Sequence, residues 1–370
     1  RYELDSIQVG SVVSGDTGSG GSASPASGGT APIIVDGKIV YAGEVSIGEL
    51  PDGRKNNILF VKSSIINAFP DVENPVITIH IPGSEKVKTS VLTGATIREM
   101  ENRKAVIEII TDMASYIFPA EELSINDLEN DFGRNVDLAD IKVSITIAEA
   151  NDAEIQEFTK AANKHSAYLV GTPVAFRISA EFDDKTVEIN RFSQYVTRLI
   201  KVPYDVNYEE ISTAVALDED GTLRHVPTKI VEIEGEYFAE IRSLTNSLYS
   251  LIRKSVEFAD CKGHYANDII NDLASRLIIS GVGNNNYAPD RDVTRAEFAI
   301  IISRASGLIN DETESLFKDV NTSDWYYSGI ISAAEYGIIY GYGDGNFGPN
   351  DKISRQQAMA MITRAMNVAG

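Results

Sequence analysis

Hydrophobic and polar residues alternate with a period of two along most of the chain between residues 33 and 252. The clearest alternating runs are residues 76–81, 105–110, 141–147 and 174–180. This pattern places one face of each strand in a core and the other in water, as in antiparallel sheets. Turn-forming pairs separate the runs: Pro82-Gly83, Asp183-Asp184, Asp220-Gly221 and Glu234-Gly235. We therefore expect a β-sandwich-like region over residues 33–255, either single or divided into two subdomains near residue 150.

Two segments of this region have helical spacing. In residues 151–164, Ile155, Phe158 and Ala162 recur at i, i+3 and i+7, which predicts an amphipathic helix. A weaker pattern predicts a second helix over residues 58–69. Residues 228–241 have two alternating runs around a Glu-Gly turn, which predicts a β-hairpin.

The N-terminal residues differ in composition from the rest. Residues 14–32 consist of Gly, Ser, Ala, Thr and Pro with one Asp, a composition typical of flexible linkers. Residues 2–13 alternate like a strand, so we interpret residues 1–32 as the end of an upstream domain followed by a linker. Arg1 is not an initiator methionine and no signal-peptide pattern follows it, so we expect a piece of a longer chain.

The C-terminal segment contains an internal repeat, with copies at residues 256–312 and 313–370. Each copy has a Phe-x-Asp element, an aromatic residue, a Gly-x-Gly element, an aromatic-x-Pro element and a Ser/Thr-Arg element. From Tyr265 and Trp325 onward, the copies are offset by a constant 60 residues. Such matching across spaced positions indicates a duplicated structural unit.

Apolar spacing predicts that each copy is a helix–loop–helix unit. The expected buried positions are Ile269, Ile270, Leu273, Leu277, Phe298, Ile301, Ile302 and Ala305, and in the second copy Ile330, Ala333, Ala334, Ile338, Ala358, Met361, Ile362 and Ala365. We expect the Gly-x-Gly glycines to end each first helix in a left-handed cap. Thr294 and Ser354 are expected to begin the second helices, in capping boxes with Glu297 and Gln357.

Arg295 and Arg355 occupy the first position of these second helices, where the helix macrodipole disfavours a cation. A cation in both copies suggests that an anion binds there. Helix N–H groups and the guanidinium would then converge on one carboxylate or phosphate. The alternative is a surface ion pair with Asp292 or Asp351.

Composition narrows the class of protein. The chain has 370 residues, 43% hydrophobic and 24% charged, which predicts two or three folded domains. Its formal net charge of −21 argues against a nucleic-acid or anionic-membrane protein, because both need a basic face. No apolar run approaches the ~20 residues of a membrane span. Cys261, the single cysteine, is expected to be buried and unpaired.

Candidate catalytic and metal-binding residues are sparse. The four histidines have no partner at metal-ligand spacing, and no nucleophile or phosphate-binding motif occurs. Residues 218–221, Asp-Glu-Asp-Gly, lack the spacing of a calcium loop, so a hairpin turn explains them better. We expect no catalytic residue, no cofactor and no metal site, with structural Ca²⁺ the one ion left open.

The two copies resemble S-layer homology repeats, the modules that fasten bacterial surface proteins to the cell wall. The resemblance rests on the elements above and covers both copies, although Tyr265 stands where Trp is usual and Gln357 where Glu is usual. The preceding region, at residues 224–228 and 243–250, is similar to a β domain that often precedes such repeats in Gram-positive surface proteins. The implied architecture is an α+β multidomain chain, with a β-sandwich-like region followed by all-α repeats.

The resemblance implies a secreted cell-surface protein that binds a pyruvylated secondary cell-wall polysaccharide. By this resemblance, the two arginines hold the pyruvyl carboxylate, the aromatic rings stack on sugars and the glycines let the backbone approach the glycan. The implied glycan-binding residues are Arg295, Arg355, Trp325, Tyr265, Thr294, Ser354, Gly281, Gly283, Gly341 and Gly343. In the family three repeats assemble with grooves between them, so we expect either that the sequence is truncated or that a third repeat comes from elsewhere.

Two other functions stay open. The β-rich region could be a structural subunit of an S-layer lattice, with self-association as its interaction. Alternatively, the chain is the C-terminal part of a polysaccharide hydrolase whose catalytic domain lies upstream or within the β-rich region. A hydrolase needs two carboxylates ~5–9.5 Å apart across a cleft. We expect this chain itself to be no enzyme and to bind no nucleic acid.

Overall fold

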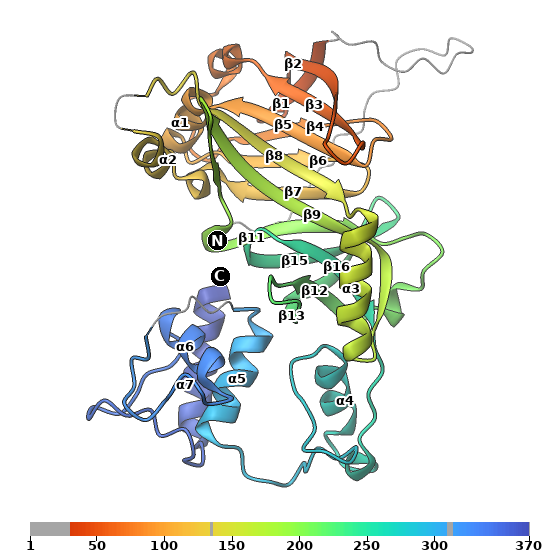
Figure 1. Ribbon diagram of the computed structural model, residues 1–370, viewed down its shortest axis with the longest axis vertical. Helices are drawn as coiled ribbons and strands as arrows, with labels where there is room; N and C mark the ends of the chain where they lie inside the picture. Colours follow the sequence, from red (N-terminus) through yellow and green to blue (C-terminus); the bar gives the residue numbers. More distant parts are fainter. Residues whose placement is uncertain (1–29, 134–135, 309–313, 370) are drawn as a thin grey trace. The chain divides into compact units, whose positions relative to one another are not determined.

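The computed structural model describes residues 30–133, 136–308 and 314–369 (Figure 1). The chain forms two compact units, the first made of residues up to Ala148 with Phe176–Ile189, and the second of Glu149–Ala175 with the residues from Asn190 onward. Strands dominate the first unit, whereas the second has strands followed by helices. The predicted α+β fold class, with a β-rich region followed by helical repeats, is confirmed.

The first unit contains short helices beside its strands. Its strands are β1 (Thr30–Val35), β2 (Lys38–Glu49), β3 (Lys55–Val61), β4 (Val76–His80), β5 (Val87–Thr93), β6 (Val106–Ile110), β7 (Ala114–Pro119), β8 (Lys142–Glu149) and β10 (Lys185–Glu188). Its helices are η1 (Ser63–Ala68), α1 (Gly94–Asn102), η2 (Ala120–Leu123) and α2 (Ile125–Phe132). Strand β9 (Tyr168–Phe182) passes from the second unit into the first.

Strand β2 joins the two layers of the first unit. Its first half pairs with β1 and its second half, from Gly43, pairs with β3. A Cβ atom on Gly43 would lie 2.8 Å from the Ala31 carbonyl oxygen, so this position needs glycine. One layer continues as β2–β1–β4–β6–β7, and the other as β2–β3–β5–β8–β9. The rings of Tyr116 on β7 and Phe176 on β9 meet edge-on, 5.2 Å apart, so the layers pack as a sandwich.

Two strand pairs of this sandwich are parallel, whereas the alternating pattern predicted antiparallel sheets. These are β3 with β5 and β4 with β6. The chain alternates between the layers from β3 to β6, so consecutive strands of one layer run in the same direction. A period of two reports burial of one face and says nothing of strand direction.

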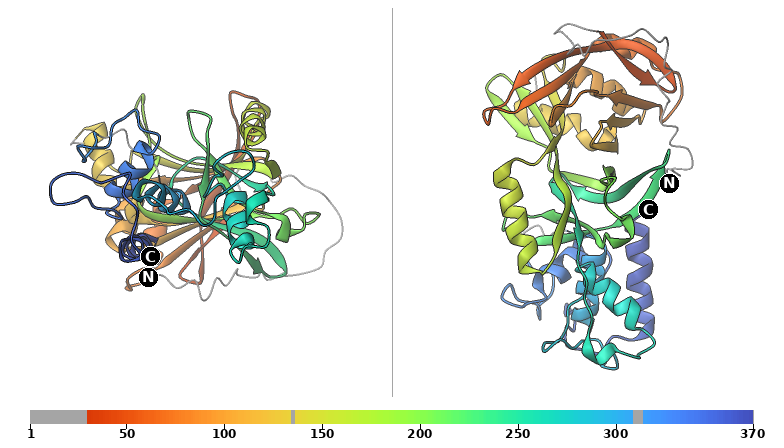
Figure 2. Two further views of the ribbon diagram at one scale, coloured as in Figure 1. Left: turned by 90° about the horizontal axis from the view of Figure 1, so that it is seen from below. Right: turned by 90° about the vertical axis from the view of Figure 1, so that its right-hand side faces the viewer.

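The second unit begins with α3 (Asp152–Lys164) and ends with the repeats. Its further strands are β11 (Arg191–Lys201), β12 (Thr213–Leu217), β13 (Leu223–Val226), β14 (Thr228–Ile233), β15 (Glu236–Thr245) and β16 (Leu248–Arg253), with a short helix η3 (Tyr208–Glu210). The helical part contains η4 (Ala259–Cys261), α4 (Asn267–Ser275), α5 (Arg295–Ala305), α6 (Tyr327–Glu335) and α7 (Arg355–Ala369). α7, at the blue end of the chain, is one uninterrupted helix (Figure 2).

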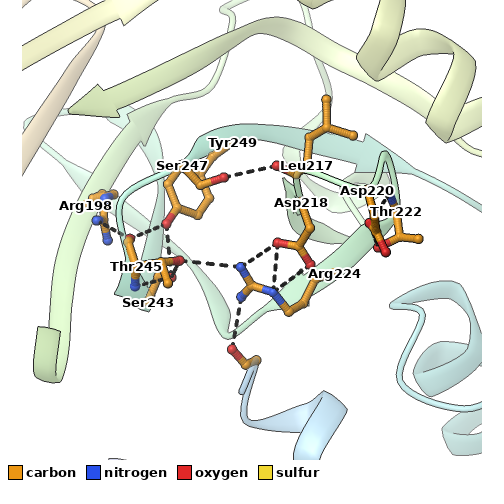
Figure 3. A network of polar contacts seen from close by, with 11 residues as sticks. Arg198, Leu217, Asp218, Asp220, Thr222, Arg224, Ser243, Thr245, Ser247 and Tyr249 are labelled. Atoms are coloured by element: carbon orange, nitrogen blue, oxygen red, sulfur yellow. Dashed lines mark hydrogen bonds and ion pairs between the residues drawn. The ribbon is translucent and has the colours of Figure 1, made fainter. Parts of the chain in front are cut away.

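The strands of the second unit contact the first repeat directly. Arg224 on β13 binds the Asp218 carboxylate at 2.9 Å and donates to the Gly307 carbonyl oxygen at 3.0 Å, just after α5 (Figure 3). The Tyr195 hydroxyl on β11 donates to the Ser306 carbonyl oxygen at 2.5 Å. Leu277, just after α4, packs on the hydrophobic cluster between α3 and the strands. The first repeat is therefore attached by packing as well as by the chain.

His225 lies beside these contacts. Its side chain is 5% exposed, and its Nδ1 lies 2.9 Å from the Thr213 hydroxyl. Burial lowers the pKa of His225 to about 3, with a smaller contribution from Arg276. The imidazole is therefore neutral at physiological pH, and its protonation opposes folding.

Several local predictions are confirmed and others are wrong. The helix over residues 151–164 and the hairpin over 228–241 are confirmed as α3 and as β14 with β15, and Cys261 is buried. The helix predicted over 58–69 is wrong, because β3 and η1 occupy it. Residues 30–32 belong to β1, so the predicted linker is too long at this end; residues 1–29, with the strand-like run, lie outside the described residues.

Candidate functional site

The Phe-x-Asp element organises the loop of each repeat. The Asp260 carboxylate accepts the N–H groups of Tyr287 and Ala288 at 2.9 and 2.7 Å. In the second repeat the Asp319 carboxylate accepts those of Phe347 and Gly348 at 2.7 and 2.8 Å. These N–H groups, led by that of Tyr287, hold the pKa of Asp260 below its ordinary value, so it stays ionised.

The first glycine of each Gly-x-Gly element packs beneath the phenylalanine of the same repeat. A Cβ atom on Gly281 would lie 2.6 Å from both the Phe258 ring and the Asn286 carbonyl oxygen. A Cβ atom on Gly341 would lie 2.8 Å from the Phe317 ring and 2.5 Å from the Asn346 carbonyl oxygen. Internal packing therefore requires these two glycines, and their predicted approach to a glycan stays a prediction.

The second glycines have open space around them. Nothing lies within 4 Å of a Cβ atom on Gly283 or Gly343, although Gly283 has a positive φ of 108°. Neither glycine pair ends a helix, contrary to the prediction. α4 and α6 end at Ser275 and Glu335, and the left-handed residues that follow are Leu277 and Gly337.

The predicted capping boxes are present in both repeats. The Glu297 N–H donates to the Thr294 hydroxyl at 3.2 Å, and the Thr294 N–H donates to the Glu297 carboxylate at 2.9 Å. Ser354 and Gln357 make the same two contacts at 3.2 and 2.9 Å. The hydroxyls of Thr294 and Ser354 therefore cap the N-terminal ends of α5 and α7. Their predicted contact with a glycan stays a prediction.

Helix α5 lies between two clusters. Ala296, Ala299 and Phe298 pack towards α6 and α7, whereas Ile301 and Ala305 pack towards α4. An inner helix is apolar on several sides for this reason. Two residues predicted to be buried on the outer helices are exposed, Ile269 at 65% and Ile362 at 42%.

Arg295 joins the first repeat to the second. Its side chain is 3% exposed; its Nε donates to the Phe347 carbonyl oxygen at 2.9 Å and its guanidinium to that of Tyr340 at 3.2 Å. The guanidinium carbon lies 4.8 Å from the centroid of the Tyr342 ring and 4.6 Å from that of Phe347. The guanidinium is thus enclosed by the loop of the second repeat.

The first turn of α5 is also occupied by the second repeat. The Arg295 N–H donates to the Asp351 carbonyl oxygen at 2.8 Å and the Ala296 N–H to that of Pro349 at 3.0 Å. The carboxylates offered as alternative partners bind elsewhere: Asp292 pairs with Lys352, and Asp351 accepts the Tyr342 hydroxyl. The anion-binding role of Arg295 stays a prediction. The first two N–H groups of α5, which were expected to take part in binding the anion, already donate to the second repeat.

Arg355, the equivalent residue of the second repeat, is exposed at the start of α7. The same element thus has two environments, enclosed at Arg295 and open at Arg355. The aromatic residues predicted to stack on sugars also face solvent, with Tyr265 94% and Trp325 68% exposed. The ring centroids of Tyr265 and His264 lie 4.4 Å apart, and those of Trp325 and Tyr326 lie 5.4 Å apart. Each exposed ring is therefore supported from one side by its neighbour.

Three residues near this site were missed by sequence reasoning. Tyr340 and Tyr342 are 59% and 42% exposed, and the guanidinium of Arg364 lies 4.5 Å from the Tyr340 ring centroid. Both tyrosines flank Gly341, whereas the first repeat has Ser280 and Val282 at these positions. Comparing the two copies at the non-matching positions would have found this second aromatic pair.

The described residues contain neither a gathered set of metal ligands nor a helix that could span a membrane. Within residues 30–133, 136–308 and 314–369, no three His, Cys, Asp or Glu side chains are gathered as a metal ion would require. The residues 218–221 form the turn of the β12–β13 hairpin, where Asp218 binds Arg224 and Asp220 accepts from Thr222. None of the described helices is long and apolar enough to span a membrane.

The comparison with protein families identifies the repeats. The S-layer homology domain matches residues 257–299 and 316–359. These ranges begin at the Phe-x-Asp elements and include the Gly-x-Gly and Ser/Thr-Arg elements. S-layer homology domains anchor surface proteins to the bacterial cell wall, so the predicted cell-surface location is confirmed.

Curated relatives match about a third of this chain. The chain is 38% identical over 122 residues to the exoglucanase XynX of Acetivibrio thermocellus, 40% over 114 residues to the endo-1,4-beta-xylanase A of Thermoanaerobacterium saccharolyticum, and 33% over 106 residues to the surface-layer 125 kDa protein of Lysinibacillus sphaericus. These matches cover 33%, 31% and 29% of this chain, but only 11%, 10% and 9% of the relatives.

The matched part of these relatives is small, and they include enzymes as well as a surface-layer protein. The S-layer homology segment is itself non-catalytic. No solved structure matches the chain significantly. The loop bound by Asp260 and Asp319, the paired caps and the family match agree on one identity: the C-terminal part of this chain consists of two S-layer homology repeats.

Proposed function

We propose that this chain anchors a surface protein non-covalently to the cell wall by binding a pyruvylated secondary polysaccharide. Arg355 binds the pyruvyl carboxylate, and the rings of Trp325 and Tyr265 stack on sugar faces. Gly283 and Gly343 leave room for the glycan to approach the backbone. The observation that supports this most directly is the exposure of both aromatic rings, 94% and 68%, at equivalent positions of the two repeats.

The chemistry of the site fits an acidic sugar. A guanidinium can bind a carboxylate through two parallel hydrogen bonds, and the positive end of the α7 macrodipole adds to the attraction. The aromatic rings offer apolar faces to the C–H groups of a sugar while their polar edges face water. A net charge of −21 makes a general attraction to an anionic polymer unfavourable, so binding has to be local and specific.

The function is tested by co-sedimentation with purified wall sacculi that either keep or lack their secondary polymer. We expect the chain to bind only sacculi that keep the polymer. Arg355→Ala and Trp325→Ala should each weaken this binding about tenfold or more, since each removes on the order of 1.4 kcal/mol of contact. Arg253→Ala, which changes an exposed arginine of β16, is the matched control and should bind normally.

Chemical removal of pyruvate from the polymer separates the two halves of the proposal. Loss of binding on depyruvylated sacculi would support the carboxylate contact with Arg355. Equal binding of pyruvylated and depyruvylated walls would contradict it while leaving wall anchoring in place. Equal binding of stripped and intact sacculi would contradict the polysaccharide as the ligand.

A further inference from the structure

A lysine side chain is buried inside the sandwich of the first unit. Lys88 lies on β5, and its side chain is 0% exposed. The register places it between Asn57 of β3 and Ile147 of β8, which are 2% and 0% exposed. Leu92, on the same face of β5, is 1% exposed. A lysine is almost never fully buried unless it has a partner, so the surroundings of its amine are informative.

The amine of Lys88 reaches from one layer of the sandwich to the other. β5 belongs to the layer that contains β3 and β8. The Lys88 Nζ donates to the Gly83 carbonyl oxygen at 2.5 Å and contacts the Asp112 carboxylate. Gly83 follows β4, and Asp112 lies in the turn between β6 and β7, so both come from the opposite layer. The contact with Asp112 therefore joins the two layers at one end of the sandwich.

Other polar groups lie at this end of the sandwich. The Asn57 side-chain amide donates to the Pro82 carbonyl oxygen at 2.5 Å, one residue before Gly83. Within the part of the chain that the structure describes, the Oδ1 atom of Asn57 and the hydroxyl of Ser90 are buried without a hydrogen-bond partner. Ser90 lies on the same face of β5 as Lys88. Buried polar atoms without partners are costly, so stability alone does not explain a polar cluster here.

An ion pair accounts poorly for the burial of Lys88. Its side chain is 0% exposed, whereas that of Asp112 is 61% exposed. Burial removes the hydration of the ammonium group, and the water around the carboxylate screens the attraction between the two charges. The pair would therefore stabilise the buried lysine only weakly. A neutral amide between the same two side chains has no ionic hydration to lose.

We propose that Lys88 and Asp112 are joined by an intramolecular isopeptide bond between Nζ and Cγ. One proton first passes from the ammonium group to the carboxylate, and the lone pair of Nζ then attacks Cγ. A C–N bond forms and a C–O bond breaks. The oxygen leaves as water with two of the three ammonium protons, and the third stays on the amide nitrogen. The condensation needs no oxidant, reductant or cofactor.

The position of the two groups favours this condensation. Two groups that the fold holds in contact react at an effective concentration far above any that free groups reach in solution. Asp112 lies at an exposed turn, so the released water leaves directly into solvent. The apolar side chains around Lys88 exclude water from the other side of the amide, which protects it from hydrolysis. This bond goes beyond wall binding and does not depend on it.

Mass spectrometry of the intact chain tests the proposal. We expect the folded protein to be one water molecule lighter than its sequence requires. Asp112→Ala removes the carboxyl group and should have the full mass of its own sequence. This variant is preferred to a change at Lys88, because truncation of an exposed side chain leaves the fold intact. A wild-type chain of full mass would overturn the proposal.

A second lysine–aspartate pair provides the matched control. The Lys352 Nζ lies 2.5 Å from the Asp292 carboxylate, and Asp292 is 67% exposed, much like Asp112. Lys352, however, is 77% exposed, so the burial of the lysine is what distinguishes the two pairs. Lys352→Ala should therefore remain one water molecule lighter than its sequence requires. Recovery of the full mass in Lys352→Ala would contradict the assignment to Lys88.

Peptide mapping locates the bond. Trypsin cleaves after lysine and arginine but not after an acylated lysine, so peptide 87–98 should stay uncut at Lys88 and carry peptide 105–134 as a branch. In Asp112→Ala the same site should be cut. Complete cleavage after Lys88 in the wild-type chain would overturn the proposal. A branch to peptide 56–62, which contains Asn57, or to peptide 63–86, which contains Glu85, would contradict Asp112 as the partner.

Discussion

At the scale of single residues, the same arginine has two environments in the two repeats. Arg295 is 3% exposed and donates to two carbonyl oxygens of the second repeat, whereas Arg355 is exposed. The sequence alone predicted one role for both, because the local motif is the same. Only the neighbour in space distinguishes them, and that neighbour is 45 or more residues away along the chain.

Arg295→Ala is expected to destabilise the repeats. It leaves the carbonyl oxygens of Tyr340 and Phe347 without these donors and removes the cation from between two aromatic rings. We expect a loss of about 2–3 kcal/mol in the free energy of unfolding, measured with urea. Arg355→Ala is the matched control and should change it by less than about 0.5 kcal/mol. Equal losses in the two variants would contradict the assignment.

His225 predicts a pH dependence of stability. Its pKa is about 3 in the fold against an ordinary 6.5, so unfolding takes up a proton at intermediate pH. The stabilisation is full above pH 6.5 and falls progressively as the pH is lowered towards 3. At pH 5 we expect a loss of about 2 kcal/mol relative to neutral pH.

The measurement is the difference between the wild-type chain and His225→Gln in urea unfolding at neutral pH and at pH ~5. Carboxylates contribute equally to both proteins, so the difference isolates the imidazole. The variant should have the shallower loss of stability on acidification. Identical pH profiles would mean that His225 is protonated in the folded chain.

At the scale of elements, predictions were confirmed where the cause is local. The capping boxes join residues three apart, and the hairpin turn lies between two adjacent strands, so the sequence contains both partners. The helix predicted at residues 58–69 is wrong because β3 pairs with β2 and β5, and pairing outweighs weak apolar spacing. The parallel pairs depend on the path of the chain between layers, which no local pattern encodes.

The Gly-x-Gly element predicts a contrast between its two glycines. Gly341→Ala forces a methyl group against the Phe317 ring and the Asn346 carbonyl oxygen, and should cost about 1–3 kcal/mol of stability. Gly343→Ala meets no atom within 4 Å and should leave stability nearly unchanged. Thermal unfolding of both variants is the measurement. A greater loss in Gly343→Ala would contradict the packing role given to Gly341.

At the scale of the whole molecule, the resemblance of the two repeats to S-layer homology modules predicted the surface location and the anchoring segment. The repeat was visible because duplicated motifs keep their spacing, and the predicted glycan site follows from matching positions. The return of the chain from one unit to the other could not be derived in the same way, since residues 149–175 belong to the second unit and residues 176–189 to the first.

The contacts made just after α5 have a mechanical consequence. When the wall holds the repeats and tension acts on the strands of the second unit, one route for the load is the covalent chain between β16 and η4. The bonds from Arg224 and Tyr195 to Gly307 and Ser306 form a second route beside it. When two routes share the load, each one carries less of it. The joint between the strands and the first repeat therefore resists pulling better than a single tether would.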